Sequence, residues 1–509
     1  MAERHTDEGS LPDSGRSPDG PPSEAALGLR RRARIGAILL GLRTVVQQLV
    51  VFGGMVWLAR LLGPKEYGTF WIVQFALQFF TFFGDAGLGA ALIQQKTPPT
   101  VSELSTVFWA QLAIGLGVVA LVYVAAPFAV TFWPDLPERG ATLLRTLSLG
   151  FLLAILRGLP ALLMERELQF GRLAALDVLL TLAFYGTAVV LAWLGWGVQA
   201  LVVAVLAQGA VGVVAAFVLR PFVPALVFDR ARFAPVLRFG VAFQTKNAIG
   251  FVNGATMPVL GGRFLGAREF GLVSWSQNTA WFSLKLVEIL ARVNFPLFSR
   301  LQDQPEEFAR TLERSVRLCA VATFFMVSIF LGLGPGLVQV LYGDRWLDAL
   351  PMLYVFALVI TIGFVSPIFA GALDAVGRPQ IVMRLSVVWT VVNWLSLTVA
   401  MWLSPTRLAF ALGLSVHVVL GNLAVIVVMK QMFPSTRFLP VVRACIVACA
   451  AVAVAARFLA LPWVRGPVTL LLALAGSAAM FALVYAAIDL RGARAAIDNL
   501  RRKPSSATP

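Results

Sequence analysis

Two similar stretches decide the fold: LARLLGPKEYG at residues 58–68 and GGRFLGAREFG at residues 261–271. They lie 203 positions apart, and their last six residues, GPKEYG and GAREFG, each place two glycines and a charged pair between long apolar runs. Glycines permit a tight turn and charged side chains remain in water, so each stretch is typical of a turn between two helices rather than of a binding site. The repetition predicts that one helical unit occurs twice in the chain.

The segments around the repeat are apolar enough to cross a lipid bilayer. Of the 509 residues, 59% are hydrophobic and 13% are charged, whereas soluble proteins carry roughly 25% charged residues. A run of about 20 apolar residues spans the hydrocarbon core, where a helix satisfies its own backbone hydrogen bonds. The sequence therefore predicts an all-α, polytopic membrane protein.

Hydropathy predicts fourteen transmembrane helices that are joined by short loops. We expect an N-terminal lobe of six helices (29–219), a cytoplasmic linker (220–236), a C-terminal lobe of six helices (237–430) and two further helices (431–490). Because an even number of helices separates the two copies of the repeat, both copies enter the membrane in the same direction. Two parallel lobes with a substrate path between them are typical of a transporter.

The two ends of the chain are polar. Residues 1–28 are rich in Pro, Gly, Ser and charge, which predicts a disordered cytoplasmic tail, and residues 491–509 form a basic cytoplasmic tail. Lys and Arg concentrate in loops on one side of the membrane, around residues 30–34, 220–238 and 300–317. Cytoplasmic loops carry this excess, so both termini are expected in the cytoplasm. The same bias accounts for much of the net charge of +16, and no nucleic-acid partner is expected.

A family resemblance rests on the repeat and on the segment after its first copy. LARLLGPKEYG followed by DAGLGAALIQQK at residues 85–96 resembles the polysaccharide-export branch of the multidrug/oligosaccharidyl-lipid/polysaccharide exporter superfamily. This branch includes the Wzx-type O-antigen and exopolysaccharide flippases, and the resemblance covers roughly residues 36–430. It implies a flippase that moves a polyprenyl-diphosphate-linked oligosaccharide across the bacterial inner membrane.

The resemblance also implies partners and a pathway. The flipped oligosaccharide would serve the biosynthesis of a surface polysaccharide: exopolysaccharide, capsule or O-antigen. Membrane lipids are expected to surround a monomer, and a polysaccharide polymerase is a candidate partner. No cofactor and no metal are expected, since the three cysteines lie in apolar segments without metal-ligand spacing.

Charges inside the predicted helices are candidates for a functional site, because ionisable groups in lipid are costly. The offset of 203 residues places Arg43 on Lys246 and Asp85 on Glu288. Each lobe thus has a cation in its first helix and an acid in its second. Arg43 and Lys246 lie equally far along their helices from the turn that follows each of them. Asp85 and Glu288 lie equally far from the turn that precedes each of them. At about 1.5 Å of rise per residue, the two cations therefore match in depth, and so do the two acids. The ion pairs Arg43–Asp85 and Lys246–Glu288 are therefore geometrically feasible.

Further polar residues follow these helices at helical spacing. We expect the polar stripes to face a hydrated cavity between the lobes, lined by the first, second, seventh and eighth helices. The candidates for binding the anionic diphosphate are the four cations Arg43, Lys246, Lys285 and Arg292. Their predicted charge partners and polar neighbours are Asp85, Glu288, Gln47, Gln74, Gln78, Asn253 and Asn278.

A purely structural interpretation stays open. Paired charges can simply hold the first two helices of each lobe together, and acids would repel a diphosphate. This interpretation applies most directly to Asp85 and Glu288. The excess of cations over acids favours a binding role for the basic residues.

Two other function classes compete with a lipid-linked oligosaccharide flippase. One is another transporter of the same superfamily, either a drug/cation antiporter or a peptidoglycan-precursor flippase. An antiporter should show uncompensated acids, whereas cations here at least match acids. The other class is a membrane-bound polysaccharide polymerase or ligase, which needs a sizeable outward catalytic loop. The expected loops are short, and the motifs GxxxxGK[ST], HExxH and GxSxG are absent from the sequence, so no enzyme is expected.

Overall fold

The computed structural model describes residues 47–489 except for 86–87, 90–91, 93–97, 134–139, 286, 288–293, 295–296, 435 and 437. Throughout this part the regular secondary structure is helical, without strands. Ten of the described helices are long and apolar enough to cross a membrane. The chain is therefore an all-α, polytopic membrane protein, as its sequence predicts, and the total of fourteen spanning helices stays a prediction.

The first half of the described chain contains six long helices. They are the helix over residues 47–61, α2 (Pro64–Asp85), α4 (Val101–Phe132), α5 (Gly140–Arg166), α6 (Phe170–Trp193) and α7 (Val198–Leu219). The side chain of Thr100 accepts a hydrogen bond from the backbone N–H of Glu103 and caps α4. Gly195 and Gly197 have positive φ angles and form the tight turn between α6 and α7.

The second half repeats this alternation of long helices and short turns. Its elements are α8 (Arg230–Phe264), α9 (Gly266–Trp281), η1 (Phe282–Leu284), α11 (Pro305–Leu341), η2 (Asp344–Ala349), α12 (Leu350–Gly363), α13 (Val365–Ala375), α14 (Pro379–Leu403), α15 (Arg407–Met432), α16 (Phe438–Ala455) and α17 (Pro467–Ile488). Pro305, Pro379 and Pro467 begin helices, where the missing N–H of proline costs no hydrogen bond.

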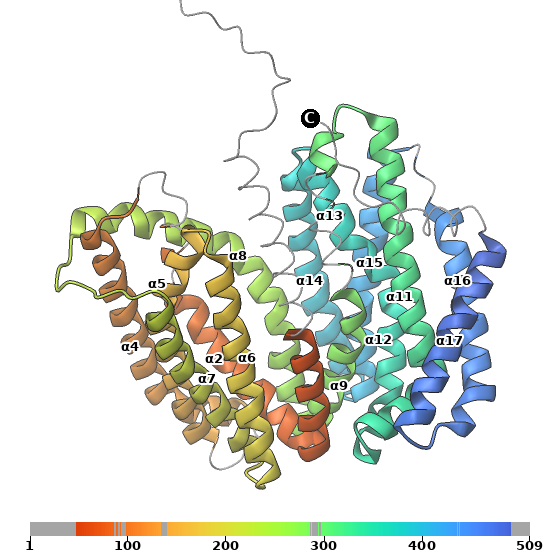
Figure 1. Cartoon of the computed structure of the whole chain (residues 1–509), viewed down its shortest axis with the longest axis horizontal. Coiled ribbons are helices and arrows are strands. Elements are labelled where there is room, and N and C mark those ends of the chain that lie inside the picture. Colours follow the sequence, from red (N-terminus) through yellow and green to blue (C-terminus); the bar gives the residue numbers. More distant parts are fainter. Residues whose placement is uncertain are drawn as a thin grey trace, which may run out of the picture.

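The helices form two groups, which we call the N-terminal group (residues 47–219) and the C-terminal group (residues 266–488). Figure 1 shows the groups side by side, with α8 crossing over the N-terminal group before it turns down between them. In the N-terminal group α5 packs against α4 and α7, and α6 packs against α7. In the C-terminal group α11 packs against α12 and α16, and α14 packs against α15.

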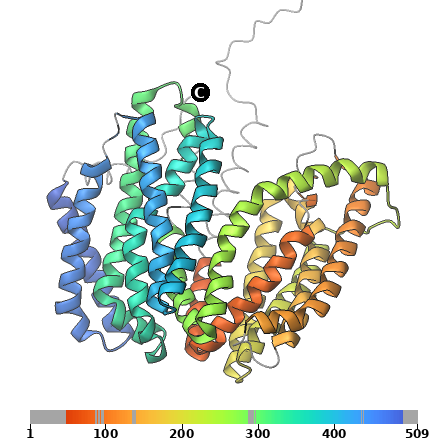
Figure 2. The ribbon, with the colours of Figure 1, turned by 180° about the vertical axis from the view of Figure 1, so that it is seen from behind.

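Both copies of the repeat lie at the same end of the molecule, which we call the repeat end. The opposite end carries the segment 220–229 between α7 and α8, and we call it the linker end. From the repeat end, α2 and α9 run in the same direction, as expected of parallel repeats. Figures 1 and 2 show that the two groups meet at the repeat end and diverge toward the linker end.

Apolar side chains occupy both the interior and the outer faces. The core of the C-terminal group includes the fully buried side chains of Phe308, Phe364 and Phe369. On the outside, α4 exposes Val124 and Phe128, each by 70% or more. Exposed apolar faces of this size are what a lipid environment accommodates at no cost.

Candidate substrate cavity

A cavity of about 920 Å³ lies between the two groups. The helix over residues 47–61, α2, α6 and α7 line it on one side. On the other side it is lined by α9, η1, α11 and α17. Its volume falls within the range of small-molecule binding sites. The cavity is therefore the candidate site of a substrate.

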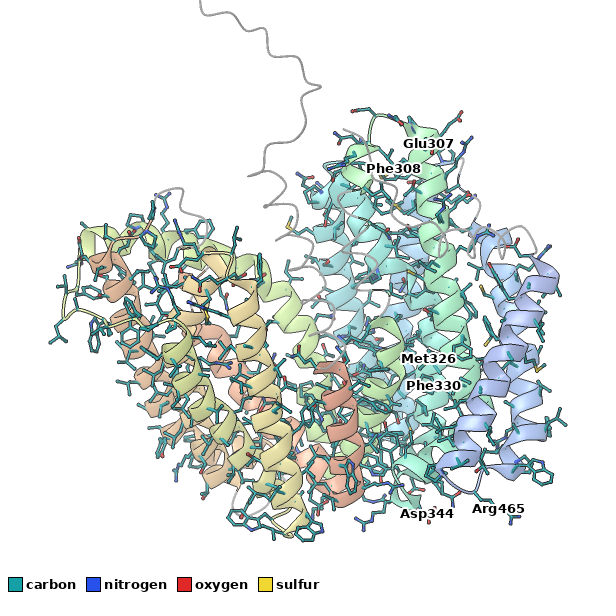
Figure 3. The ribbon with its side chains drawn as sticks, in the orientation of Figure 1. Glu307, Phe308, Met326, Phe330, Asp344 and Arg465 are labelled. Atoms are coloured by element: carbon teal, nitrogen blue, oxygen red, sulfur yellow. The ribbon has the colours of Figure 1, made fainter. Side chains whose placement is uncertain are left out.

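Most of the cavity wall is apolar, and much of it comes from the middle of α11. Met326 and Phe330 belong to this wall and lie at mid-length of α11 in Figure 3, between Phe308 near the linker end and Asp344 at the repeat end. Phe325 and Ile329 line the cavity from the same helix, and Leu474 adds an apolar side chain from α17. This wall favours an apolar chain over a hydrated ligand.

A smaller part of the wall is polar. Besides tyrosines, its amide, hydroxyl and amine side chains are Gln48, Gln74, Thr181, Gln208, Asn278, Thr279 and Lys285. The side-chain oxygen Oε1 of Gln74 is buried and has no hydrogen-bond partner within the described residues. A buried acceptor without a partner is a place where a ligand hydroxyl can bind.

The polar residues on α6 and α7 are held by hydrogen bonds to their neighbours. Gln47 Nε2 donates to Thr181 Oγ1 at 3.2 Å, and Thr181 donates to the carbonyl oxygen of Asp177 at 2.8 Å. Gln208 Nε2 donates to the carbonyl oxygen of Leu180 at 3.3 Å. These bonds fix the positions of Thr181 and Gln208 in the cavity wall.

The cavity ends in aromatic side chains at the repeat end. Tyr67 and Tyr342 line it, and each contacts a buried tryptophan. The ring centroids of Tyr67 and Trp346 lie 5.5 Å apart in an edge-to-face arrangement, and those of Trp275 and Tyr342 lie 4.9 Å apart. Edge-to-face pairs of this kind add to the energy of apolar burial.

The predicted site residues whose side chains the structure describes lie at several places. Gln74, Asn278 and Lys285 line the cavity, and Gln47 lies directly behind Thr181. Gln78 is exposed on α2, one turn from Gln74. Asn253 lies on α8, where its side-chain oxygen accepts a hydrogen bond of 2.9 Å from Asn393 of α14. Among the lining residues that the structure describes, none comes from α8.

The structure describes the remaining predicted residues only by their backbone or not at all. Arg43, Glu288 and Arg292 are not among the described residues, and of Asp85 and Lys246 only the backbone is described, in α2 and α8. The ion pairs Arg43–Asp85 and Lys246–Glu288 therefore stay predictions. Within the described lining, Lys285 is the one charged residue.

Several lining residues were not predicted from the sequence. Gln208 is the one polar side chain in the middle of the apolar helix α7, and this isolation is a signal that could have identified it. The apolar residues of α11 and α17 carry no such signal, because a lipid-facing side chain and a cavity-facing side chain have the same composition.

The fold and the cavity define a class of protein: a polytopic membrane protein with two helix groups around a central cavity. The family described as "Polysaccharide biosynthesis protein" matches residues 57–351 of the chain. Since this match covers more than half of the sequence, the chain belongs to this family.

Curated relatives carry the names of polysaccharide biosynthesis and transport proteins. The teichuronic acid biosynthesis protein TuaB of Bacillus subtilis (strain 168) is 27% identical over 54% of this chain and 57% of its own length. The lipopolysaccharide biosynthesis protein WzxC of Escherichia coli (strain K12) is 25% identical over 69% of this chain and 70% of its own length. The succinoglycan biosynthesis transport protein ExoT of Rhizobium meliloti (strain 1021) is 28% identical over 59% of this chain and 60% of its own length. The matches thus span between 57% and 70% of these relatives.

Two solved structures share the fold. The lipid II flippase MurJ, in an inward closed conformation, aligns with 91% of this chain and all of its own with a TM-score of 0.72 and 13% identity. An inward-facing multidrug resistance MATE family transporter of the MOP superfamily aligns with 79% of this chain and all of its own with a TM-score of 0.59 and 13% identity. The chain therefore shares the fold of these two proteins.

Proposed function

We propose that the protein is a flippase, which translocates a polyprenyl-diphosphate-linked oligosaccharide across the inner membrane for the biosynthesis of a surface polysaccharide. The observation that carries this proposal is the mixed chemistry of the cavity between the two helix groups. Among the residues that the structure describes, it combines a long apolar wall with several amides and one cation. Membership of a polysaccharide biosynthesis family supports the same substrate class.

Each part of such a substrate has a matching part of the cavity. The polyprenyl chain is apolar and suits the wall formed by Phe325, Met326 and Ile329 of α11. The sugar hydroxyls suit the amides of Gln74 and Asn278, which can donate and accept hydrogen bonds. The diphosphate is anionic, and Lys285 supplies an ammonium group.

The other three predicted cations extend the assignment of the diphosphate to Lys285. Arg43, Lys246 and Arg292 join Lys285 in attracting the diphosphate, while Asp85 and Glu288 position the cations and release them when the two groups move. The linker end is the cytoplasmic face in this proposal, so both termini are cytoplasmic and the N- and C-terminal lobes divide at 220–236. The protein acts as a monomer and delivers its product to a polysaccharide polymerase.

The test is export of surface polysaccharide in a flippase-null strain that carries variants at matched protein level. Lys285→Ala should lower polymer production about tenfold or more, since hydrogen bonds to charged groups are the stronger ones. Lys285→Arg should retain part of the activity, because the charge remains but its geometry changes.

Lys430→Ala is the matched control, because Lys430 is exposed near the linker end of α15 and away from the cavity. It should produce polymer at the wild-type level. Polymer at the wild-type level from Lys285→Ala, together with unchanged membrane insertion, would exclude the cation from substrate binding.

A further inference from the structure

The two copies of the repeat pack against each other at the glycine that ends each copy. Gly68 of α2 and Gly271 of α9 occupy equivalent positions, 203 residues apart. A Cβ added to Gly68 would overlap the carbonyl oxygen of Ala267 and lie 2.8 Å from the backbone nitrogen of Gly271. A Cβ added to Gly271 would overlap the carbonyl oxygen of Pro64. The helix backbones thus touch directly, and only glycine fits on either side.

The aromatic residues of the repeat are exchanged between the groups. Tyr67 belongs to the N-terminal group, yet it is packed into the hydrophobic core of the C-terminal group. Its equivalent, Phe270 of α9, is packed into a core formed by α2, α4 and α5. Each copy therefore inserts its aromatic side chain into the opposite group.

Two tryptophans make a second reciprocal contact. Trp346 follows α11 and donates from Nε1 to the carbonyl oxygen of Ala59 at 2.8 Å. Ala59 is equivalent to Gly262 by the same offset of 203 residues. Trp133, which follows α4, lies against Gly262, where an added Cβ would be 2.8 Å from its Cδ1. The indole of Trp346 thus lies on the first copy of the repeat, and the indole of Trp133 lies on the equivalent position of the second copy.

One contact breaks this symmetry. Arg60 donates from Nε to the carbonyl oxygen of Leu341 at 2.6 Å and from Nη2 to that of Val340. These carbonyls close the C-terminal end of α11, where they lack intrahelical partners and carry partial negative charge. Arg263, the equivalent of Arg60, is exposed and makes no such bond to the described residues. A cation of the N-terminal group therefore caps a helix of the C-terminal group, but not the reverse.

We propose that the repeat is a reciprocal lock that holds the repeat end closed, and that Arg60 is its latch. For the cavity to open at this end, the glycine contact must separate, Tyr67 and Phe270 must leave the opposite cores, and Arg60 must leave the end of α11. Since the charged donor makes the strongest of these bonds, its loss favours separation most. The lock rests on the proposed function only in that transport requires the repeat end to open.

The test measures separation of the groups directly, without transport. Spin labels are placed at Leu194→Cys and Ser404→Cys, which are exposed at the repeat end of the two groups, and their distance distribution is recorded in lipid nanodiscs. The native cysteines Cys319, Cys445 and Cys449 are buried. The otherwise unchanged protein should show one dominant short distance.

Arg60→Gln should raise the ratio of long to short distances about tenfold, because it removes hydrogen bonds from a charged donor. Arg60→Lys should give an intermediate ratio. The matched control Arg263→Gln should leave the distribution unchanged. Gly68→Ala should also favour the long distance, whereas Gly186→Ala should not, since a Cβ there meets no atom within 4 Å.

Unchanged distances in both Arg60→Gln and Gly68→Ala would overturn the lock, and equal shifts in the Arg60 and Arg263 variants would overturn the latch. Should Arg60→Gln fail to fold, Arg60→Lys and Gly68→Ala decide in the same way. A shift in distance together with absent oligosaccharide transport would overturn the proposed function and leave the lock in place.

Discussion

The side chain of Gln74 is placed to bind a substrate rather than to stabilise the fold. Its side-chain oxygen is buried beside the cavity and has no hydrogen-bond partner among the described residues. A buried acceptor without a partner costs the folded state roughly 1–3 kcal/mol. A residue retained at such a cost is best explained by a partner that arrives with the substrate.

Gln74→Met should therefore uncouple the two properties. The free energy of unfolding in detergent should stay the same or rise by about 1 kcal/mol, because no protein hydrogen bond at Oε1 is lost. Polysaccharide export should fall by about tenfold, because the ligand loses its acceptor. A drop in stability that accompanies the drop in export would instead give Gln74 a structural role.

Asn422 provides the opposite case, because its hydrogen bonds lie within the protein. Ser366 of α13 donates to Asn422 Oδ1 at 2.6 Å, and Asn422 Nδ2 donates to the carbonyl oxygen of Val418 at 2.7 Å. Asn422→Ala should lower the free energy of unfolding by about 0.6–1.7 kcal/mol, which are the average and the maximum for such bonds in a membrane protein. A double-mutant cycle with Ser366→Ala checks the assignment. Additive effects of the two changes would show that the bond contributes nothing.

At the scale of the elements, glycines determine how closely the helices approach. A Cβ added to Gly421 of α15 would overlap the indole ring of Trp389 on α14. Gly421→Ala should push these two helices apart and lower the free energy of unfolding by about 1–3 kcal/mol, the usual cost of overpacking. Gly476→Ala on α17 is the matched control, since a Cβ there meets no atom within 4 Å. Equal stability of the two variants in a denaturant titration would contradict the packing argument.

The sequence predicts the elements well, because long apolar runs and short polar turns are local signals. The all-α class, the turns at Gly63 and Gly266 and the common direction of α2 and α9 agree with the structure. Polar residues on helical stripes also led to Gln74, Asn278 and Lys285 in the cavity wall. These inferences needed no knowledge of how distant helices pack.

Tertiary contacts could not be predicted in this way. The repeat is a turn, as expected, and Lys65 is exposed at it. Its sequence nevertheless contains no sign that Tyr67 and Gly68 meet the opposite helix group. The apolar wall of the cavity was missed for a related reason, since residues of α11 that face the cavity look like residues that face lipid. A hydrated cavity was expected, whereas the described wall is mostly apolar.

At the scale of the whole molecule, the cavity and the lock at the repeat end lie next to each other between the two helix groups. The cavity holds apolar, polar and cationic side chains between the groups, and the lock closes it at the repeat end. The groups diverge toward the linker end (Figure 1), and the proposed function would place substrate access at that end and exit at the repeat end. A lipid-linked substrate would keep its apolar chain near the bilayer throughout this cycle.

Transfer of a polyprenyl-diphosphate-linked oligosaccharide between the leaflets of proteoliposomes tests the central claim most directly. The purified protein should speed this transfer well above that of protein-free vesicles. Lys285→Ala should reduce the protein-dependent rate about tenfold, whereas Lys430→Ala should not change it. Transfer at the rate of protein-free vesicles, by a preparation that remains folded and correctly inserted, would contradict the assignment of this cavity to a lipid-linked oligosaccharide.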